Sequence, residues 1–171
     1  MQNQIPEKVL ELLRRLREAG LRPVLMGGAV RDLYHGKTPR DWDILFLSHW
    51  ADLGDTVETA IEVVDECAEH YFDFYAAYGE SRLFGVLKLH QDEIDCIFYG
   101  GDYTDAAVLA SRMDTTLNAY WIDPEVSWDI QHLPNASHIT GLIEVQRADD
   151  PPSTDRLQYL AEKYPQYKVV V

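Results

Sequence analysis

The sequence predicts a single α+β domain, with a small appendage at its C-terminal end. Three observations lead to this class. Helical and strand-like hydrophobic patterns alternate over the first half of the chain, and two strand-like segments near residue 90 are too close together for a helix to lie between them. The length, 171 residues, suffices for one well-packed core.

The first elements alternate between helix and strand. Apolar residues recur at helical spacing over 5–16, with Gly20 as the stop signal. The short apolar run at 22–26 predicts a buried strand that ends at a glycine pair, Gly27 and Gly28. A second helical pattern then continues to a glycine at position 36. The order is therefore helix, strand, glycine turn, helix.

The middle of the chain predicts three strands and a helix. A strand is expected at 41–47, followed by an acidic helix whose apolar stripe ends at Cys67. The segments 83–89 and 93–99 are separated by only three polar residues, which predicts a β-hairpin. The aromatic run that begins at Tyr71 is interpreted as core packing. It comprises Tyr71, Phe72, Phe74 and Tyr75.

The last part of the chain has a weaker pattern. Residues 104–119 are expected to be helical in part, and 120–147 to hold several short strands. The segment 149–153 is typical of a linker, and an amphipathic helix capped by Ser153 or Thr154 should follow it. The domain boundaries expected are thus 1–148 for the main domain and 149–171 for the linker and C-terminal helix.

The composition is that of an ordinary globular protein. Hydrophobic residues make up 46% and charged residues 26%, and no apolar run approaches the roughly 20 residues that span a bilayer. The N-terminus is amphipathic rather than signal-like, so we expect a cytoplasmic protein that does not enter a membrane. Cys67 and Cys96 show no CxxC spacing and are expected to be buried free thiols.

The net charge of −14 is unevenly distributed along the chain. Residues 1–50 carry a net charge of +2, residues 51–110 carry −12 and residues 111–171 carry −4. A surface that grips nucleic acid depends on Lys and Arg, so any phosphate-binding surface should draw mainly on the first fifty residues. The acidic middle is expected to be largely a solvated face.

Two carboxylates lie on one expected strand. Because side chains alternate between the faces of a strand, Asp41 and Asp43 should project to the same side. Asp95 occupies a later strand between apolar neighbours and can complete a three-carboxylate cluster. Like charges held this close favour a hard divalent cation such as Mg²⁺, and such clusters support two-metal phosphoryl chemistry.

The glycine turn supplies a complementary feature. Gly27 and Gly28 would present backbone N–H groups at the start of a helix, where a phosphate can bind, and Arg31 lies one turn later. A glycine pair or a DxD motif alone indicates little. Both occur here within 17 residues, which is a more specific combination.

The segment GGAVRDLYHGKTPRDWDI resembles the signature of the head domain of bacterial CCA-adding tRNA nucleotidyltransferases and poly(A) polymerases, in the DNA polymerase β-like superfamily. Two later blocks are also similar to this family: FGVLKL with EIDCI, and RMDTTLNA. The resemblance implies a mixed sheet flanked by helices and a template-independent transfer of nucleotides. It implies metal binding by Asp41, Asp43 and Asp95. The nucleotide-binding positions carried over are Gly27, Gly28, Arg31, Asp32, Arg40, Arg112, Asp114 and Asn118.

The chain also departs from the family pattern. The family continues into a neck whose motif selects the base and into further helical domains, whereas this sequence offers only Asp149–Pro151 and Asp155–Arg156, with altered spacing, as a possible neck remnant. The arginine expected after the third carboxylate is missing, and Met113 replaces another. Asp32 has an alternative role, pairing with a neighbouring arginine.

Three hypotheses follow. The first is a stand-alone Mg²⁺-dependent enzyme, with two ions expected, that uses ATP or CTP and adds nucleotides to an RNA, tRNA-like 3′ end. The second keeps the chemistry but transfers to a small molecule or a protein hydroxyl, which suits the acidic surface. The third is a nucleotide-sensing or partner-binding module without turnover. A basic stripe from the first helix to Arg31 and Arg40 would favour the first hypothesis.

Overall fold

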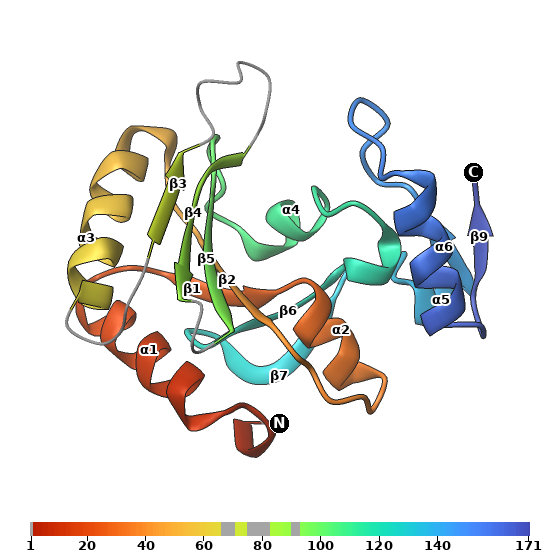
Figure 1. The fold of residues 1–171 in the computed structure, drawn as a ribbon, viewed down its shortest axis with the longest axis horizontal. Coiled ribbons are helices and arrows are strands. Elements are labelled where there is room, and N and C mark those ends of the chain that lie inside the picture. Colours follow the sequence, from red (N-terminus) through yellow and green to blue (C-terminus); the bar gives the residue numbers. More distant parts are fainter. Residues whose placement is uncertain (1, 66–70, 75–82, 90–92) are drawn as a thin grey trace.

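The computed structural model describes residues 2–65, 71–74, 83–89 and 93–171. Figure 1 shows a central sheet with helices packed around it and a smaller C-terminal part on the right. Within the described ranges, no helix has the length and apolar character needed to cross a bilayer.

The central sheet has seven strands in the order β3-β4-β5-β2-β1-β6-β7. Only the pair β2 and β5 is parallel, and the other neighbours are antiparallel, so the sheet is mixed. The predicted α+β class and the predicted pairing of 83–89 with 93–99 are therefore confirmed. The strands are β1 (Pro23–Met26), β2 (Trp42–Phe46), β3 (Tyr71–Phe74), β4 (Leu83–Leu89), β5 (Ile94–Tyr99), β6 (Tyr120–Asp123) and β7 (Ser127–His132).

Helices cover both faces of this sheet. The larger core joins one face to α1, α2 and α3, and a smaller core joins the opposite face to α4. Strand alternation produces this division, since Ile44 and Phe46 enter the larger core while Leu45 enters the smaller one. The helices are α1 (Glu7–Glu18), α2 (Gly28–Tyr34), α3 (Leu53–Asp65), α4 (Ala106–Ala110), α5 (Ser137–Thr140) and α6 (Thr154–Lys163).

The C-terminal part has its own small core. Parallel strands β8 (Leu142–Glu144) and β9 (Lys168–Val170) pair beside α6. Leu117, Ile143, Leu160 and Tyr164 form a buried cluster there. β8 precedes residue 148 and β9 follows it, so the pairing of these two strands joins the two predicted parts of the chain. The boundary between 148 and 149 remains a prediction.

Several local predictions can be compared with the structure. Ser153 caps α6, because its side chain accepts a hydrogen bond from the Arg156 N–H. Cys96 is a buried free thiol, whereas Cys67 lies outside the described residues. Phe72 packs against the larger core as expected, and Tyr75 also lies outside the described residues. The strands β3 and β9 were not predicted from the sequence.

Candidate active site

Two carboxylates meet at adjacent strands of the central sheet. Asp43 of β2 and Asp95 of β5 are register partners across the parallel pair, so both side chains project from the same face. They share this face with Leu45, which packs under α4. The smaller core thus supports the carboxylates from one side, and their other side borders a cavity.

Asp41 lies just outside β2, although the sequence predicted that it would be the first residue of this strand. β2 begins at Trp42, and Asp41 is held instead by Arg40, whose Nε and Nη2 donate to Asp41 Oδ2 at 3.0 and 2.9 Å. The Asp41 side chain is 53% exposed. Strand alternation therefore does not fix the direction of Asp41, but the residue lines the same cavity as Asp43 and Asp95.

The electrostatics of this site favour a cation. Burial, together with the nearby charges of Asp95 and Asp41, raises the pKa of Asp43 to about 7. A carboxylate with a raised pKa beside two other carboxylates matches the hard oxygen ligands that Mg²⁺ prefers. Within the described residues, however, no group of three His, Cys, Asp or Glu side chains is arranged to hold a metal ion. The ligand set predicted from the sequence remains a prediction.

The glycine turn lies directly against Asp43. Gly27 has a φ of +81°, and a Cβ at this position would lie 3.0 Å from Asp43 Oδ2. Gly28 begins α2, and a Cβ there would lie 3.2 Å from Arg31 Nη2. A Cβ at either position would therefore crowd its neighbour by a few tenths of an ångström, and the backbone conformation of Gly27 also favours glycine.

Arg31 and Asp32 belong to a buried network. The Arg31 Nε donates to Asp32 Oδ1 at 2.9 Å and to the Tyr164 hydroxyl at 3.1 Å, and its Nη1 donates to Asn118 Oδ1 at 2.9 Å. Asp32 also accepts hydrogen bonds from Tyr164 and from Lys163 Nζ. The pairing of Asp32 with an arginine, considered from the sequence, is thus present. Both residues still line the cavity.

The segment RMDTTLNA, residues 112–119, contains the carboxylate that anchors α6. Asp114 Oδ1 accepts from Asn118 Nδ2 at 2.5 Å, and Asp114 Oδ2 accepts from Arg156 Nε at 3.0 Å. Arg112 is exposed near the end of α4 and is not among the residues that line the cavity. The structure therefore brings Asp114 and Asn118 next to the cavity wall and leaves Arg112 apart from it.

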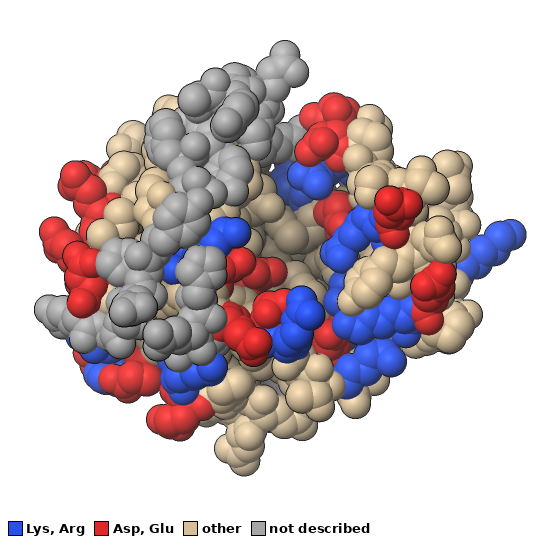
Figure 2. Space-filling model, viewed as in Figure 1, with Lys and Arg blue, Asp and Glu red and all other residues tan. Residues whose placement is uncertain are grey.

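The cavity has a volume of about 590 Å³, which is the size expected for a small-molecule site. Figure 2 shows the hollow near the centre of the molecule, with acidic and basic side chains on its rim. Its lining residues are Gly28, Ala29, Arg31, Asp32, Arg40, Asp41, Asp43, Asp95, Arg156, Tyr159 and Lys163. Another cavity, of about 520 Å³, is lined by Arg22, His49 and Asp52 among others and by none of the predicted site residues.

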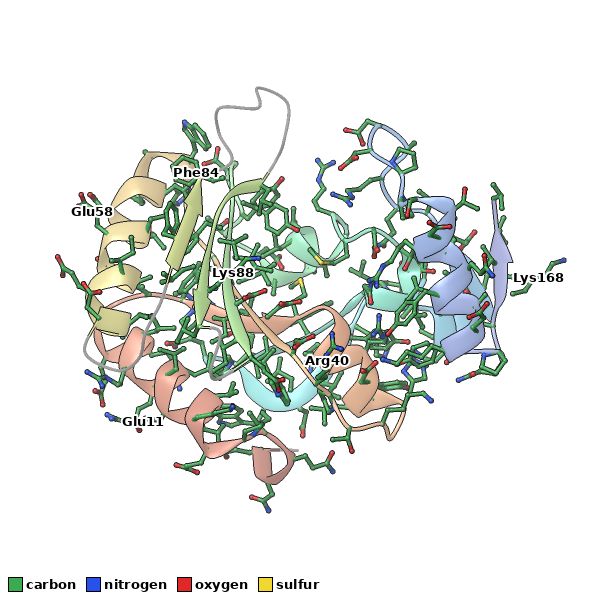
Figure 3. The ribbon with its side chains drawn as sticks, in the orientation of Figure 1. Glu11, Arg40, Glu58, Phe84, Lys88 and Lys168 are labelled. Carbon is green, nitrogen blue, oxygen red and sulfur yellow. The ribbon has the colours of Figure 1, made fainter. Side chains whose placement is uncertain are left out.

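The sequence did not predict that Tyr159, Lys163 and Lys88 would lie at or beside this site, and it indicated Arg156 only within a possible neck remnant. Arg156, Tyr159 and Lys163 form one wall, and their spacing along α6 places them on one helix face. Lys88 of β4 pairs in register with Asp95, so its side chain leaves the same face of the sheet. In Figure 3, Lys88 lies near the middle of the view. The alternation within the predicted hairpin was a signal for Lys88, whereas the α6 wall depends on tertiary packing.

Solved structures share the fold of this chain. A CCA-adding enzyme in complex with CTP aligns with 99% of this chain at a TM-score of 0.66 and 18% identity. The chain has the fold of CCA-adding enzymes. The Thermotoga maritima CCA-adding enzyme complexed with tRNA aligns with 98% of the chain at a TM-score of 0.65 and 20% identity. A tRNA nucleotidyltransferase complexed with a primer tRNA and an incoming ATP analogue aligns with 93% at a TM-score of 0.62 and 19% identity.

The matched proteins are longer than this chain. The chain spans 42%, 40% and 46% of the lengths of those three proteins. In sequence, poly(A) polymerase I of Salmonella typhi is 50% identical over 40 residues, which is 23% of this chain and 9% of that protein. No protein-family model matches the chain. The resemblance seen in the sequence motifs is therefore confirmed at the level of the fold.

Proposed function

We propose that the protein is a nucleotidyltransferase that moves a nucleoside monophosphate from a nucleoside triphosphate to the 3′ hydroxyl of an RNA. The observation that carries the proposal is the adjacent pair Asp43 and Asp95 in the lining of a cavity of about 590 Å³, with Asp43 directly against the glycine turn. In the reaction, the acceptor hydroxyl gives up its proton to solvent and its oxygen forms a bond to the α-phosphorus. The bond from the α-phosphorus to the oxygen that bridges it to the β-phosphorus breaks, and pyrophosphate leaves.

The site residues fall into two groups: the carboxylates would bind the metal ion, and the glycines and Arg31 would bind the triphosphate. Asp43 and Asp95, with Asp41, would hold Mg²⁺, which supplies neutralisation of the charge on the transferring phosphate. Gly27 and Gly28 allow the backbone of the turn to approach the triphosphate closely. Arg31, already oriented by Asp32, Tyr164 and Asn118, adds a fixed positive charge. Positioning and electrostatics are thus the protein's main contributions.

The proteins similar to this chain support RNA as the acceptor. Two of the structures with this fold contain tRNA, and the Salmonella match is a poly(A) polymerase. Arg156 lies at the position where the sequence suggested a neck remnant, and its Nε is anchored to Asp114. Its Nη groups therefore have a defined direction at the cavity wall, which suits contact with a bound nucleotide.

One observation favours a different acceptor with the same chemistry. Arg14 is paired with Glu11 and Glu18, Arg17 with Glu125, and Arg31 is buried. The basic stripe from α1 to Arg31 and Arg40 that would favour an RNA acceptor is therefore not formed by these residues. A small molecule or a protein hydroxyl would not need such a stripe.

The test is incubation of the protein with each α-labelled nucleoside triphosphate, Mg²⁺, total tRNA and a cell extract, followed by separation of RNA, protein and small molecules. The control is the double variant Asp43→Asn with Asp95→Asn, which should lose roughly 100-fold or more of the activity. Label in RNA supports the proposal, and label in another fraction supports the second acceptor class. Nucleotide binding without any carboxylate-dependent transfer would instead support a sensing module.

A further inference from the structure

Tyr159 is an exposed aromatic residue in the wall of a polar cavity. It is 47% exposed, and it lies on α6 between Arg156 and Lys163, whose side-chain hydrogen bonds are part-buried. Its neighbour Leu160 is fully buried, and so is Tyr164 one turn later. α6 therefore packs its apolar side into the C-terminal core and leaves the Tyr159 ring on the cavity side.

The two cations beside Tyr159 are held by carboxylates of the main domain. Arg156 Nε donates to Asp114 at 3.0 Å, and Lys163 Nζ donates to Asp32 at 2.9 Å. The Arg156 guanidinium carbon lies 5.8 Å from the Tyr159 ring centroid and Lys163 Nζ lies 5.7 Å from it. These anchored cations limit the movement of the ring. Among the described residues, the Tyr159 hydroxyl has no hydrogen-bond partner.

We infer that Tyr159 is the surface on which the base of the bound nucleoside triphosphate stacks. The inference rests on the proposed function for the identity of the ligand. The carboxylates and the glycine turn occupy the other side of the cavity and account for the triphosphate, but they offer no flat apolar surface for a base. Tyr159 is the one aromatic residue among those that line the cavity in the described part of the chain. Base stacking on an aromatic ring is strong and tolerates different bases.

Stacking on Tyr159 predicts a difference in affinity between ATP and CTP. Because the larger purine ring overlaps more of a tyrosine than a pyrimidine does, Tyr159 should contribute more to ATP binding than to CTP binding. The triphosphate should be bound independently of this residue. A ligand that lacks a base therefore separates stacking from a general disturbance of the cavity.

The experiment compares the dissociation constants of ATP, CTP and inorganic tripolyphosphate, each with Mg²⁺, by calorimetry. Tyr159→Ala should weaken ATP binding by roughly 5- to 100-fold and CTP binding less. Tyr159→Phe should bind ATP as the natural protein does, because the ring is retained. Tripolyphosphate binding should not change in either variant. The matched control is Tyr34→Ala, since Tyr34 is 38% exposed but is not among the cavity-lining residues.

Two outcomes would overturn the inference. One is equal ATP affinity in Tyr159→Ala and the natural protein, which would show that no base rests on this ring. The other is an equal loss in Tyr159→Phe and Tyr159→Ala, which would assign the contact to the hydroxyl. Since these measurements record binding, a lack of transfer activity would contradict the proposed reaction and leave this inference intact.

Discussion

Gly27 fixes the position of Asp43. A methyl group at residue 27 would lie 3.0 Å from Asp43 Oδ2, and the φ of +81° disfavours any other residue. We expect Gly27→Ala to reduce transfer by about 10- to 100-fold, because the strained backbone and a shift of Asp43 by a few tenths of an ångström disturb the catalytic geometry. Steady-state kinetics of the purified variant measures this loss.

Gly36 provides the control for this change. Its φ is +69°, but a Cβ there would meet no atom within 4 Å. Gly36→Ala should therefore lose stability by about 1–2 kcal/mol and keep its activity. If both variants lost activity equally, backbone strain rather than contact with Asp43 would be responsible.

At the residue scale, the sequence predicted some positions well and others only in part. The sequence predicted Asp43 on one strand and Asp95 on a later strand of the same sheet, and the two are register partners, whereas the alternation expected for Asp41 does not apply because β2 begins at Trp42. The sequence also placed Arg31 one turn into α2. It could not show that Tyr164 would bury Arg31, since the two residues are 133 positions apart and meet only through tertiary packing.

The contact between α2 and the segment around α6 depends on the Tyr164 hydroxyl. This hydroxyl donates to Asp32 and accepts from Arg31 Nε, while its ring fills the C-terminal core. Tyr164→Phe should therefore lower the free energy of unfolding by about 1–3 kcal/mol, because two buried polar groups lose a partner. Urea unfolding measures the change. Tyr159→Phe should lie within about 0.5 kcal/mol of the natural protein.

His35 makes the same contact sensitive to pH. Its Nδ1 lies 2.7 Å from the Arg31 carbonyl and its Nε2 lies 2.7 Å from the Tyr167 hydroxyl, so the neutral ring satisfies both groups. Burial, with the nearby charge of Arg31, lowers the pKa of His35 in the folded protein. Below about pH 6.5 the unfolded chain takes up a proton that the folded protein resists, and stability should fall.

Protonation of Asp43, whose pKa is raised to about 7, adds stability over the same pH range, so a variant is needed to isolate the effect of His35. As the pH is lowered from 7 to 5.5, the melting temperature of the natural protein should decrease relative to that of His35→Gln, which lacks the titrating imidazole. His49→Gln is the control, because the His49 side chain is 68% exposed. An unchanged profile in His35→Gln would show that other groups cause the decrease.

At the element scale, long periodic segments and the apolar run of β1 were predictable, whereas the short strands β3 and β9 were not. α1 and α6 have apolar stripes of several turns, and their sequences predicted them. β3 has four residues and β9 has three, which is too few for a periodic pattern. These strands exist because β4 and β8 offer an edge to pair with, and a single sequence does not reveal such an edge.

The charge of the whole molecule limits how it can bind RNA. The net charge is −14, and arginines of α1 are paired with glutamates. If RNA is the acceptor, we expect few phosphate contacts, and a plot of log K against log salt with a slope no steeper than about −3. Filter binding between 50 and 200 mM salt, as rough limits, measures this slope. A steep slope would indicate a cationic surface that these ion pairs conceal.

The cavity-lining residues of α6 are synthesised after the other residues of the cavity. The carboxylates and the glycine turn come from residues 27–95, whereas Arg156, Tyr159 and Lys163 emerge later. At about 5–20 residues per second, the growing chain carries the acidic pair for several seconds before α6 exists. During that time Arg31 and Asp32 lack Lys163 and Tyr164. A nascent chain therefore cannot form the complete cavity, and nucleotide binding should begin only once the last helix has folded onto the rest.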